Sequence, residues 1–395
     1  MQISPETQLF IREHSSDDVR ALALQAKKYP DINMPTAITQ IAGRQVAAEK
    51  IPSWREIEEI WYPKHLSLEQ CSSEITARYK ARLFQGDSLI DLTGGFGIDC
   101  SFLATGFKTA TYVERQEELC EIAAHNFPIL NLNHINVRNE DGVAYLQSMS
   151  PVDCIFLDPA RRNEHGGKTV AISDCEPNVA ELEALLLSKA NRVMIKLSPM
   201  LDLSLALKEL KHTQEIHILS VNNECKELLI LLGQTSPAEI AIHCVNLLTK
   251  GTQEEQHLVF TREQEQRSQC TYTDSLGNYL YEPNASLLKA GAFRSIAAAY
   301  PVRKLHPNSH LYTSDSFIEN FPGRIFRIVN QCSFNKKEVK ENLADLKKAN
   351  VTVRNFPTTV AELRKRLHLT EGGDTYLFAS TLNNGQKVII RCEKV

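Results

Sequence analysis

The segment from Ser88 to Ala104, SLIDLTGGFGIDCSFLA, constrains the fold more than any other part of the chain. Apolar residues lead into Asp91, glycines occupy three of the four positions from Gly94 to Gly97, and a helix-like stretch follows. Glycines at such a turn let the backbone bend sharply and approach a ligand closely. The start of the next helix offers unpaired N–H groups. Because the ligand crevice of an open parallel sheet lies beyond the carboxyl ends of its strands, the segment predicts a cofactor-binding turn.

The rest of the chain is expected to alternate between strands and helices around this turn. Strands are predicted over 88–93, 109–114, 135–141, 152–158, 192–198, 215–222 and 226–232, and helices over 97–105, 116–127, 176–190 and 201–211. Apolar strands that alternate with helices predict an α/β fold with a parallel sheet covered on both faces. Only the short sequence NNEC separates the last two strands, so one strand near that edge is expected to be antiparallel.

Four regions are expected along the chain. Residues 1–80 have helical spacing, residues 81–250 hold the sheet, residues 251–322 are polar and turn-rich with a helix over 284–300, and residues 323–395 read as a small βαβαββ domain. An Asn-Gly turn between the last two strands of this tail is a strong hairpin signal. The length of 395 residues agrees with two or three domains.

Composition indicates a globular protein of a reducing compartment. The start of the chain lacks the pattern of a signal peptide, and the most apolar run, LLILLG, is too short to cross a bilayer, so no membrane partner and a cytoplasmic location are expected. The ten cysteines include no C-x-x-C pair, which favours free thiols over a disulfide framework, and no metal ligands are predicted. The net charge is −4, but residues 323–395 carry +7 and the remainder −11, so the tail is basic.

The turn itself lacks the spacing of a dinucleotide-binding or a triphosphate-binding loop. Its pattern D-x-T-G-G-x-G resembles the first motif of class I S-adenosylmethionine (SAM) methyltransferases, in which an acid is followed by spaced glycines. Asp91, Gly95 and Gly97 match this motif, Thr93 stands where the first glycine often is, and Gly94 is extra. Taken alone, the pattern fits a structural strand–helix turn as well.

Three further acids, each at the end of a predicted strand, strengthen the resemblance. Glu114 ends the strand in TATYVERQ, Asp141 follows INVRNE, and Asp158-Pro159 ends VDCIFLDP. The resemblance implies that Glu114 accepts hydrogen bonds from the ribose of SAM and that Asp141 reads the adenine amino group. It also implies that Asp158 opens the fourth motif of the family. The family resemblance covers roughly residues 69–233 and implies a Rossmann-like seven-stranded methyltransferase sheet.

A helix precedes the first strand, in the sequence EQCSSEITARYKARL. In the family this segment often closes over the methionine end of SAM, which makes Gln70, Ser72, Ser73 and Thr76 candidates. A serine at this place fits a helix N-cap equally well.

The segment DPARR carries the predicted chemistry. Family members that methylate base nitrogens usually have Asp or Asn, two prolines and an aromatic residue here. Asp158 and Pro159 are kept, whereas Ala160 and Arg161 depart from the pattern. The predicted catalytic residues are Asp158, Pro159 and Arg161, because holding a nitrogen lone pair in line with an activated methyl group is most of the catalysis. A guanidinium at 161 can stack on a base or hold a phosphate, although it also fits a solvated loop.

The acceptor atom is expected to be nitrogen. Methylation of a pyrimidine carbon needs a cysteine nucleophile, and neither DPARRN nor KLSPML at the ends of the fourth and fifth strands contains one.

Over nearly its whole length the chain resembles a bacterial family of methyltransferases with a small ferredoxin-like insert and a THUMP-like C-terminal domain. The motifs that carry this resemblance include SSEITARYKARL, DLTGGFGIDC, LDPARR and FPTTVAELRKRLHLTEGGDTYLFAS. It implies RNA (tRNA or rRNA) as the partner, and the basic tail agrees, since Lys and Arg contacts to phosphate dominate nucleic-acid affinity. A protein or small-molecule substrate stays open, as does a non-catalytic SAM- or RNA-binding module.

Overall fold

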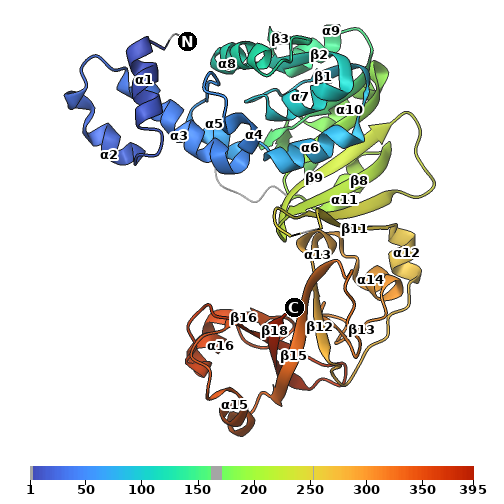
Figure 1. Ribbon diagram of the computed structural model, residues 1–395. Helices are drawn as coiled ribbons and strands as arrows, with labels where there is room; N and C mark the ends of the chain where they lie inside the picture. Colours follow the sequence, from blue (N-terminus) through green and yellow to red (C-terminus); the bar gives the residue numbers. More distant parts are fainter. Residues whose placement is uncertain (1–2, 162–170, 252) are drawn as a thin grey trace. The chain divides into compact units, whose positions relative to one another are not determined.

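The computed structural model describes residues 3–161, 171–251 and 253–395 (Figure 1). The chain divides into two compact units, which are described one at a time. The first comprises the residues up to Gln214 together with Leu229–Pro237, and the second comprises Glu215–Leu228 and Ala238–Val395.

The first unit begins with short helices, as the sequence predicts for residues 1–80. They are α1 (Pro5–Glu13), α2 (Val19–Leu24), the 3-10 turn η1 (Ala26–Lys28), α3 (Met34–Lys50), α4 (Pro52–Arg55), α5 (His65–Gln70) and α6 (Glu74–Leu83). Side chains of Ser4, Asp18 and Asn33 cap three of these helices by accepting backbone N–H groups. Helix α6 leads directly into the first strand of the sheet.

A nine-stranded sheet contains all seven predicted strands and two more. Its strands are β1 (Gly86–Asp91), β2 (Phe107–Glu114), β3 (Ile135–Asn139), β4 (Val152–Leu157), β7 (Ala190–Leu197), β8 (Thr213–Val221), β9 (Glu224–Gly233), β10 (Ala241–Leu247) and β11 (Glu255–Phe260). They are ordered β11-β10-β8-β9-β7-β4-β1-β2-β3. Strands β3, β2, β1, β4 and β7 pair in parallel, and β11 pairs antiparallel with β10. The α/β fold class is confirmed, and β10 and β11 extend the predicted sheet.

Helices and turns connect these strands. They are α7 (Ile98–Leu103), η2 (Ala104–Gly106), α8 (Glu117–Ile129), α9 (Gly142–Ser148), η3 (Ile172–Asp174), α10 (Val179–Lys189) and α11 (Leu203–Glu209). A small hairpin pairs β5 (Ala160–Arg161) with β6 (Cys175–Glu176). The sequence analysis predicts no helix at α9, a seven-residue helix that Asp141 caps. The β8–β9 connection is a two-residue turn in which Asn222 and Asn223 have positive φ, as hairpin turns require.

The strand order fixes where a ligand would bind. The run β3-β2-β1-β4-β7 follows the 3-2-1-4-5 order of a doubly wound sheet, whose topological switch point lies between its first and fourth strands. Here these strands are β1 and β4, which are paired from Leu89 with Cys154 to Asp91 with Phe156. The carboxyl ends of β1 and β4 therefore border the expected ligand crevice.

The second unit contains β10, β11 and most of β8, together with a separate seven-stranded sheet. Its strands are β12 (Tyr279–Pro283), β13 (Arg303–Lys304), β14 (Tyr312–Ser314), β15 (Gly323–Ser333), β16 (Asn350–Val353), β17 (Thr375–Thr381) and β18 (Lys387–Lys394), in the order β13-β14-β12-β15-β18-β17-β16. Its helices are α12 (Arg262–Arg267), α13 (Ala285–Ala290), α14 (Phe293–Ala299), α15 (Lys336–Leu343) and α16 (Val360–Leu367). From β15 onward the elements follow the predicted βαβαββ order. Antiparallel pairing of β12 with β15 joins this tail to the preceding segment in one sheet.

The single helix predicted over 284–300 is wrong, since two helices occupy this segment. Gly291 ends α13 in the left-handed conformation, with φ of 76°, and α14 starts two residues later. A glycine at this helix end supplies a conformation that other residues rarely adopt. Among the described residues, no helix is both long enough and apolar enough to span a bilayer.

Candidate active site at the carboxyl ends of β1 and β4

The glycine turn after β1 leaves its outer side open. Gly95 has φ of 54°, and a Cβ atom added to it would meet nothing closer than the Thr93 carbonyl oxygen at 3.8 Å. Gly97, with φ of 86°, is the N-cap of α7. Gly94 has a different role, because an added Cβ would lie 2.2 Å from the Tyr112 ring. The extra glycine of the motif is thus explained by packing against β2, and Gly95 provides the open approach for a ligand.

Thr93, which departs from the family pattern, joins the ends of the two central strands. Its N–H donates to Asp91 Oδ1 at 3.0 Å, and its Oγ1 accepts the Asp158 N–H at 2.6 Å. A glycine at this position could not make the second bond. The side chain of Thr93 therefore fixes the turn after β4 against the turn after β1.

Glu114 and Asp141 lie at the ends of β2 and β3, as predicted, and both carboxylates bind backbone N–H groups. Glu114 is buried, and its oxygens accept from Gly95 at 2.9 Å and from Gln116 at 2.8 Å. Asp141 is exposed and caps α9, where Oδ1 accepts from Val143 and Ala144 at 3.0 Å each. Glu114 thus ties the glycine turn to β2, while each of its oxygens retains a lone pair for a further donor.

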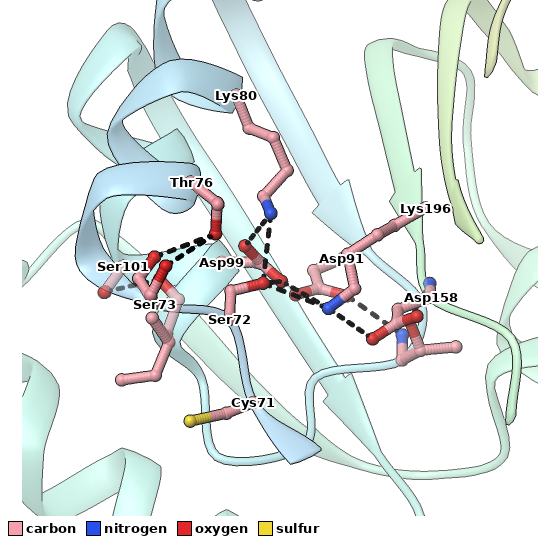
Figure 2. Close-up of polar contacts among 12 residues, drawn as sticks. Cys71, Ser72, Ser73, Thr76, Lys80, Asp91, Asp99, Ser101, Asp158 and Lys196 are labelled. Atoms are coloured by element: carbon pink, nitrogen blue, oxygen red, sulfur yellow. Dashed lines mark hydrogen bonds and ion pairs between the residues drawn. The ribbon is translucent and has the colours of Figure 1, made fainter. Parts of the chain in front are cut away.

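A cluster of two ammonium groups and two carboxylates lies beside this turn (Figure 2). Lys80 Nζ is 3.0 Å from Asp99 Oδ1, and Lys196 Nζ is 3.1 Å from Asp99 Oδ2 and 2.6 Å from Asp158 Oδ2. Ser72 Oγ donates to Asp99 Oδ2 at 2.7 Å and accepts from both ammonium groups at 3.0 Å. We call these five residues the Lys–Asp cluster.

Burial makes the charges of the Lys–Asp cluster depend on one another. Lys80 is fully buried, and the side chains of Asp99 and Lys196 are only 10% exposed, whereas that of Asp158 is 37% exposed. Burial opposes ionisation of Asp99, but Lys196 and Lys80 outweigh it and hold its pKa below the usual range. Burial raises the pKa of Asp158, and Lys196 acts against that shift. Asp158 is therefore the accessible end of a charge-balanced buried cluster.

Three members of this cluster, Lys80, Asp99 and Lys196, are absent from the candidates drawn from the sequence. Lys196 does carry a signal, because it is a charge within the apolar strand RVMIKL. Asp99 falls in the first turn of α7, where an acid also fits a favourable helix-dipole position. Lys80 is a buried residue of α6, and the sequence alone does not show that this side of the helix is buried.

The segment before β1 places its candidates differently. Gln70 is exposed at the end of α5. Ser72 is buried, and its hydroxyl already uses its donor and both lone pairs within the Lys–Asp cluster. Ser73 occupies the N-cap position of α6, and the buried Thr76 donates to its carbonyl oxygen at 3.0 Å. The assignment of Gln70, Ser72 and Thr76 to the cofactor stays a prediction.

The residues after β4 are described only in part. Pro159 is buried, and the backbone of Arg161 pairs with Cys175 in the β5–β6 hairpin. The side chain of Arg161 lies outside the described structure, as does the whole of Arg162. The role of Arg161 stays a prediction.

Asp91 differs from the other acids of the site because one of its oxygens is buried and has no partner among the described residues. The side chain is buried, Oδ1 accepts from Thr93, and Oδ2 lacks a hydrogen bond to any described residue. Burial raises the pKa of Asp91 to about 8, with contributions from the nearby Asp99 and Asp158 carboxylates, while the Thr93 N–H and Lys196 act in the opposite direction.

This shift predicts a pH-dependent loss of stability that Asp91→Asn should remove. Between the ordinary value of 3.8 and the folded value of about 8, the folded chain binds one proton more than the unfolded chain, so stability falls as pH rises. The asparagine cannot ionise. We expect the change in unfolding free energy between pH 5 and pH 8, measured by urea titration, to be smaller in Asp91→Asn by roughly 1–3 kcal/mol. Asp87→Asn, at an exposed position of the same strand, is the control, and equal pH dependence in Asp91→Asn and wild type would contradict a protonated Asp91.

Comparison with known proteins identifies the family. Residues 279–322 match the model of a ferredoxin-like domain, and residues 323–394 match that of a THUMP-like domain. The crystal structure of a "putative methyltransferase" from Porphyromonas gingivalis W83 is similar over 100% of both chains, with 34% sequence identity and a TM-score of 0.87. The chain belongs to the same methyltransferase family. The resemblance inferred from the sequence is therefore confirmed.

Other similarities are weaker. An rRNA methylase from Streptococcus thermophilus is 13% identical and covers 40% of this chain and 94% of its own, with a TM-score of 0.31. A "putative methyltransferase" from Streptococcus mutans in complex with SAH is 12% identical and covers 40% of this chain and 96% of its own, with a TM-score of 0.30. Neither bears on the substrate or the cofactor of this family member. No curated protein matches the chain.

Proposed function

We propose that this family member is a SAM-dependent methyltransferase that methylates a nitrogen atom of an RNA base. The observation that carries the proposal is the gathering of the open glycine turn, Glu114, Asp141 and Asp158 at one edge of the parallel sheet, on both sides of its switch point.

The residues at this edge fit the cofactor. The backbone at Gly95 is open to a ligand, and the buried Glu114 retains lone pairs that can accept ribose hydroxyls. Asp141 is exposed one strand further along, where it can accept from the adenine amino group. SAM, when bound, supplies an activated methyl group, so the protein needs to hold the two reactants rather than generate a nucleophile.

The position of Asp158 suits it to hold the acceptor. Lys196 fixes Asp158 Oδ2 at 2.6 Å, and Thr93 fixes its backbone N–H, which leaves Oδ1 to accept a hydrogen bond from an amino group. Such a bond orients the nitrogen lone pair toward the methyl group. Holding the two reactants in this geometry makes the transfer effectively unimolecular, which lowers its activation barrier. The methylated nitrogen gains a positive charge as the new bond forms and afterwards loses a proton to water.

Exposed lysines of the THUMP-like segment support RNA as the substrate. Lys336, Lys337 and Lys340 are exposed on α15, and Lys347 and Lys348 are exposed just after it. With a balance of +7, residues 323–395 offer charges that can contact phosphate groups.

The cofactor assignment predicts that Glu114→Ala lowers SAM affinity. Losing a carboxylate that accepts from ribose should cost roughly 1–3 kcal/mol of binding free energy. Calorimetric titration with SAM measures this, with Glu117→Ala, an exposed acid three residues further on, as the control. Unchanged SAM affinity in a folded Glu114→Ala protein would contradict the assignment.

The substrate assignment predicts a change in salt dependence. If Lys336, Lys337 and Lys340 contact phosphates, replacing all three by Gln should lower the slope of log K against log salt by about 2–3 for RNA binding. Substitution is preferable to deletion of the tail, because β15 pairs with β12 and deletion would break the sheet. The matched control replaces the exposed Lys27, Lys28 and Lys208 by Gln. An equal slope of log K against log salt for both triple variants would contradict a contact between α15 and RNA.

Labelling experiments decide between this activity and its alternatives. The protein is incubated with labelled SAM and total RNA from cells that lack it, and the RNA is digested to nucleosides. Label on a base nitrogen is the expected result. Label that appears only in protein or small molecules of the extract would favour those substrates, and SAM binding without any transfer would favour a non-catalytic module.

A further inference from the structure

Three strands of the large sheet each bring one histidine to the same face. In β8 the sequence reads Glu215-Ile-His217, in β10 it contains His243, and in β11 it reads Glu255-Gln-His257. Residues two apart in a strand point to the same side. Two E-x-H strands thus flank a strand with a central histidine, in a part of the chain that the proposed methyl transfer does not use.

The register of the strands places these side chains next to one another. His217 lies directly opposite His243 in the parallel pair β8–β10. In the antiparallel pair β10–β11, His257 lies opposite Val245, which makes it the diagonal neighbour of His243. Diagonal neighbours remain within reach of long or aromatic side chains.

The distances between the donor atoms suit a single ion. His243 Nδ1 is 3.2 Å from His257 Nε2, and His217 Nε2 is 3.3 Å from Glu215 Oε2. The ligand atoms of Glu215, His217 and His243 all lie within 4.8 Å of one another. In tetrahedral coordination with bonds of 2.0–2.1 Å, neighbouring ligand atoms are about 3.3 Å apart.

We propose that His217, His243, His257 and Glu215 form a binding site for one divalent transition-metal ion of the zinc class. Three imidazoles and one carboxylate suit Zn²⁺ and related ions, whereas Mg²⁺ and Ca²⁺ prefer ligand sets made only of oxygen. Four protein ligands would close the coordination sphere, as in structural rather than catalytic zinc sites.

Loading requires two rearrangements. His257 lies 3.2 Å from His243 but outside the group of ligand atoms within 4.8 Å of one another, so its exposed side chain has to move toward Glu215 and His217. The rings of His217 and His243 are stacked, with centroids 4.3 Å apart and planes 17° apart. An ion that both rings bind must lie near both ring planes, so one ring has to turn about its Cβ–Cγ bond. The torsion energy around this bond is broad for histidine, which makes the turn inexpensive.

Glu255 is a positioning residue for His257 in this proposal. Its Oε1 lies 4.0 Å from His257 Nδ1, on the far side of the ring from His243. A carboxylate that attracts the Nδ1 proton leaves Nε2 with the lone pair that a metal needs. The bound ion would clamp β8, β10 and the edge strand β11 together.

The test uses the full chain, treated with a chelator and then freed of it, and titrated with Zn²⁺ alone by calorimetry. We expect binding to saturate at one ion per chain. His243→Ala and the more exposed His257→Ala should each weaken binding by at least about tenfold, and Glu255→Gln by about 10–100-fold. Titration with Co²⁺ adds a spectroscopic readout, because tetrahedral Co²⁺ absorbs visible light strongly.

The control is His212→Ala, which removes another imidazole–carboxylate contact, of 3.2 Å to Glu183, that is not part of any metal-capable group among the described residues. This variant should bind Zn²⁺ as the wild type does. Absence of saturable Zn²⁺ binding, or wild-type affinity in folded His257→Ala, would overturn the proposal. The exposed position of His257 keeps this variant decisive even if His243→Ala fails to fold.

Discussion

Asp99→Ala is expected to destabilise the fold by about 3–5 kcal/mol, the cost of breaking a buried ion pair on one side. Asp99 is the anion that both ammonium groups share, with contacts of 3.0 Å to Lys80 and 3.1 Å to Lys196. Its loss leaves two ammonium groups, those of the fully buried Lys80 and of Lys196, facing the single carboxylate of Asp158 within the Lys–Asp cluster. Urea titration of the free energy of unfolding measures the effect.

Two further variants separate charge from packing in this result. Asp87→Ala removes an acid that lies 2.8 Å from Lys108 at the surface, and it should change stability little because solvent screens an exposed pair. The double variant Asp99→Ala/Lys80→Met restores the charge balance of the cluster, so it should be more stable than Asp99→Ala alone. A double variant no more stable than the single one would mean that lost packing, and not the uncompensated ammonium, causes the effect.

The sequence predicts the ends of the strands well, because each candidate acid lies at the end of a strand-like segment or just after it. Asp91 ends β1, Glu114 ends β2 and Asp158 follows β4, as the spacing indicates. In a parallel sheet, strand ends on one edge are neighbours, so a correct strand assignment already gathers the site. The open glycine turn is predictable for the same reason, since glycine alone adopts φ values such as that of Gly97 without strain.

The interior of the site is less predictable, because its members meet only through packing. Lys80, Asp99 and Lys196 come from a helix before β1, the helix after it and strand β7. Lys80 and Asp99 have ordinary surface explanations when read alone, and only Lys196, within an apolar strand, carries a signal. The pairing of β12 with β15 and the row of histidines on β8, β10 and β11 also depend on which strands become neighbours. Periodicity identifies strands but does not order them.

Asp158→Ala is expected to slow methyl transfer by a factor of roughly 10²–10³, the scale for removing one pre-organised polar contact to the reacting group. SAM affinity should change little, because Glu114 and Asp141 remain. Single-turnover transfer to a confirmed RNA substrate, at saturating RNA, measures the rate of the chemical step. Arg161→Ala should instead raise the RNA concentration needed for half-maximal rate more than it lowers that rate, if Arg161 holds the nucleotide.

The role of the carboxylate is decided by comparing Asp158→Asn with Asp158→Ala. An amide keeps one acceptor oxygen, for which Lys196 and the substrate amino group would compete, so the asparagine variant should be slower than wild type but faster than the alanine variant if Asp158 only orients the amino group. If Asp158 instead removed a proton during transfer, the asparagine variant would lose as much as the alanine variant. Because burial raises the pKa of Asp158, protonation of this side chain should begin at a pH above the ordinary 3.8. A protonated carboxyl group keeps one acceptor oxygen, as asparagine does, so the resulting fall in the wild-type rate should be no larger than the loss in Asp158→Asn, which should show no such step. A full rate in Asp158→Ala at saturating RNA would show that methyl transfer takes place without this side chain and that DPARR is only a loop.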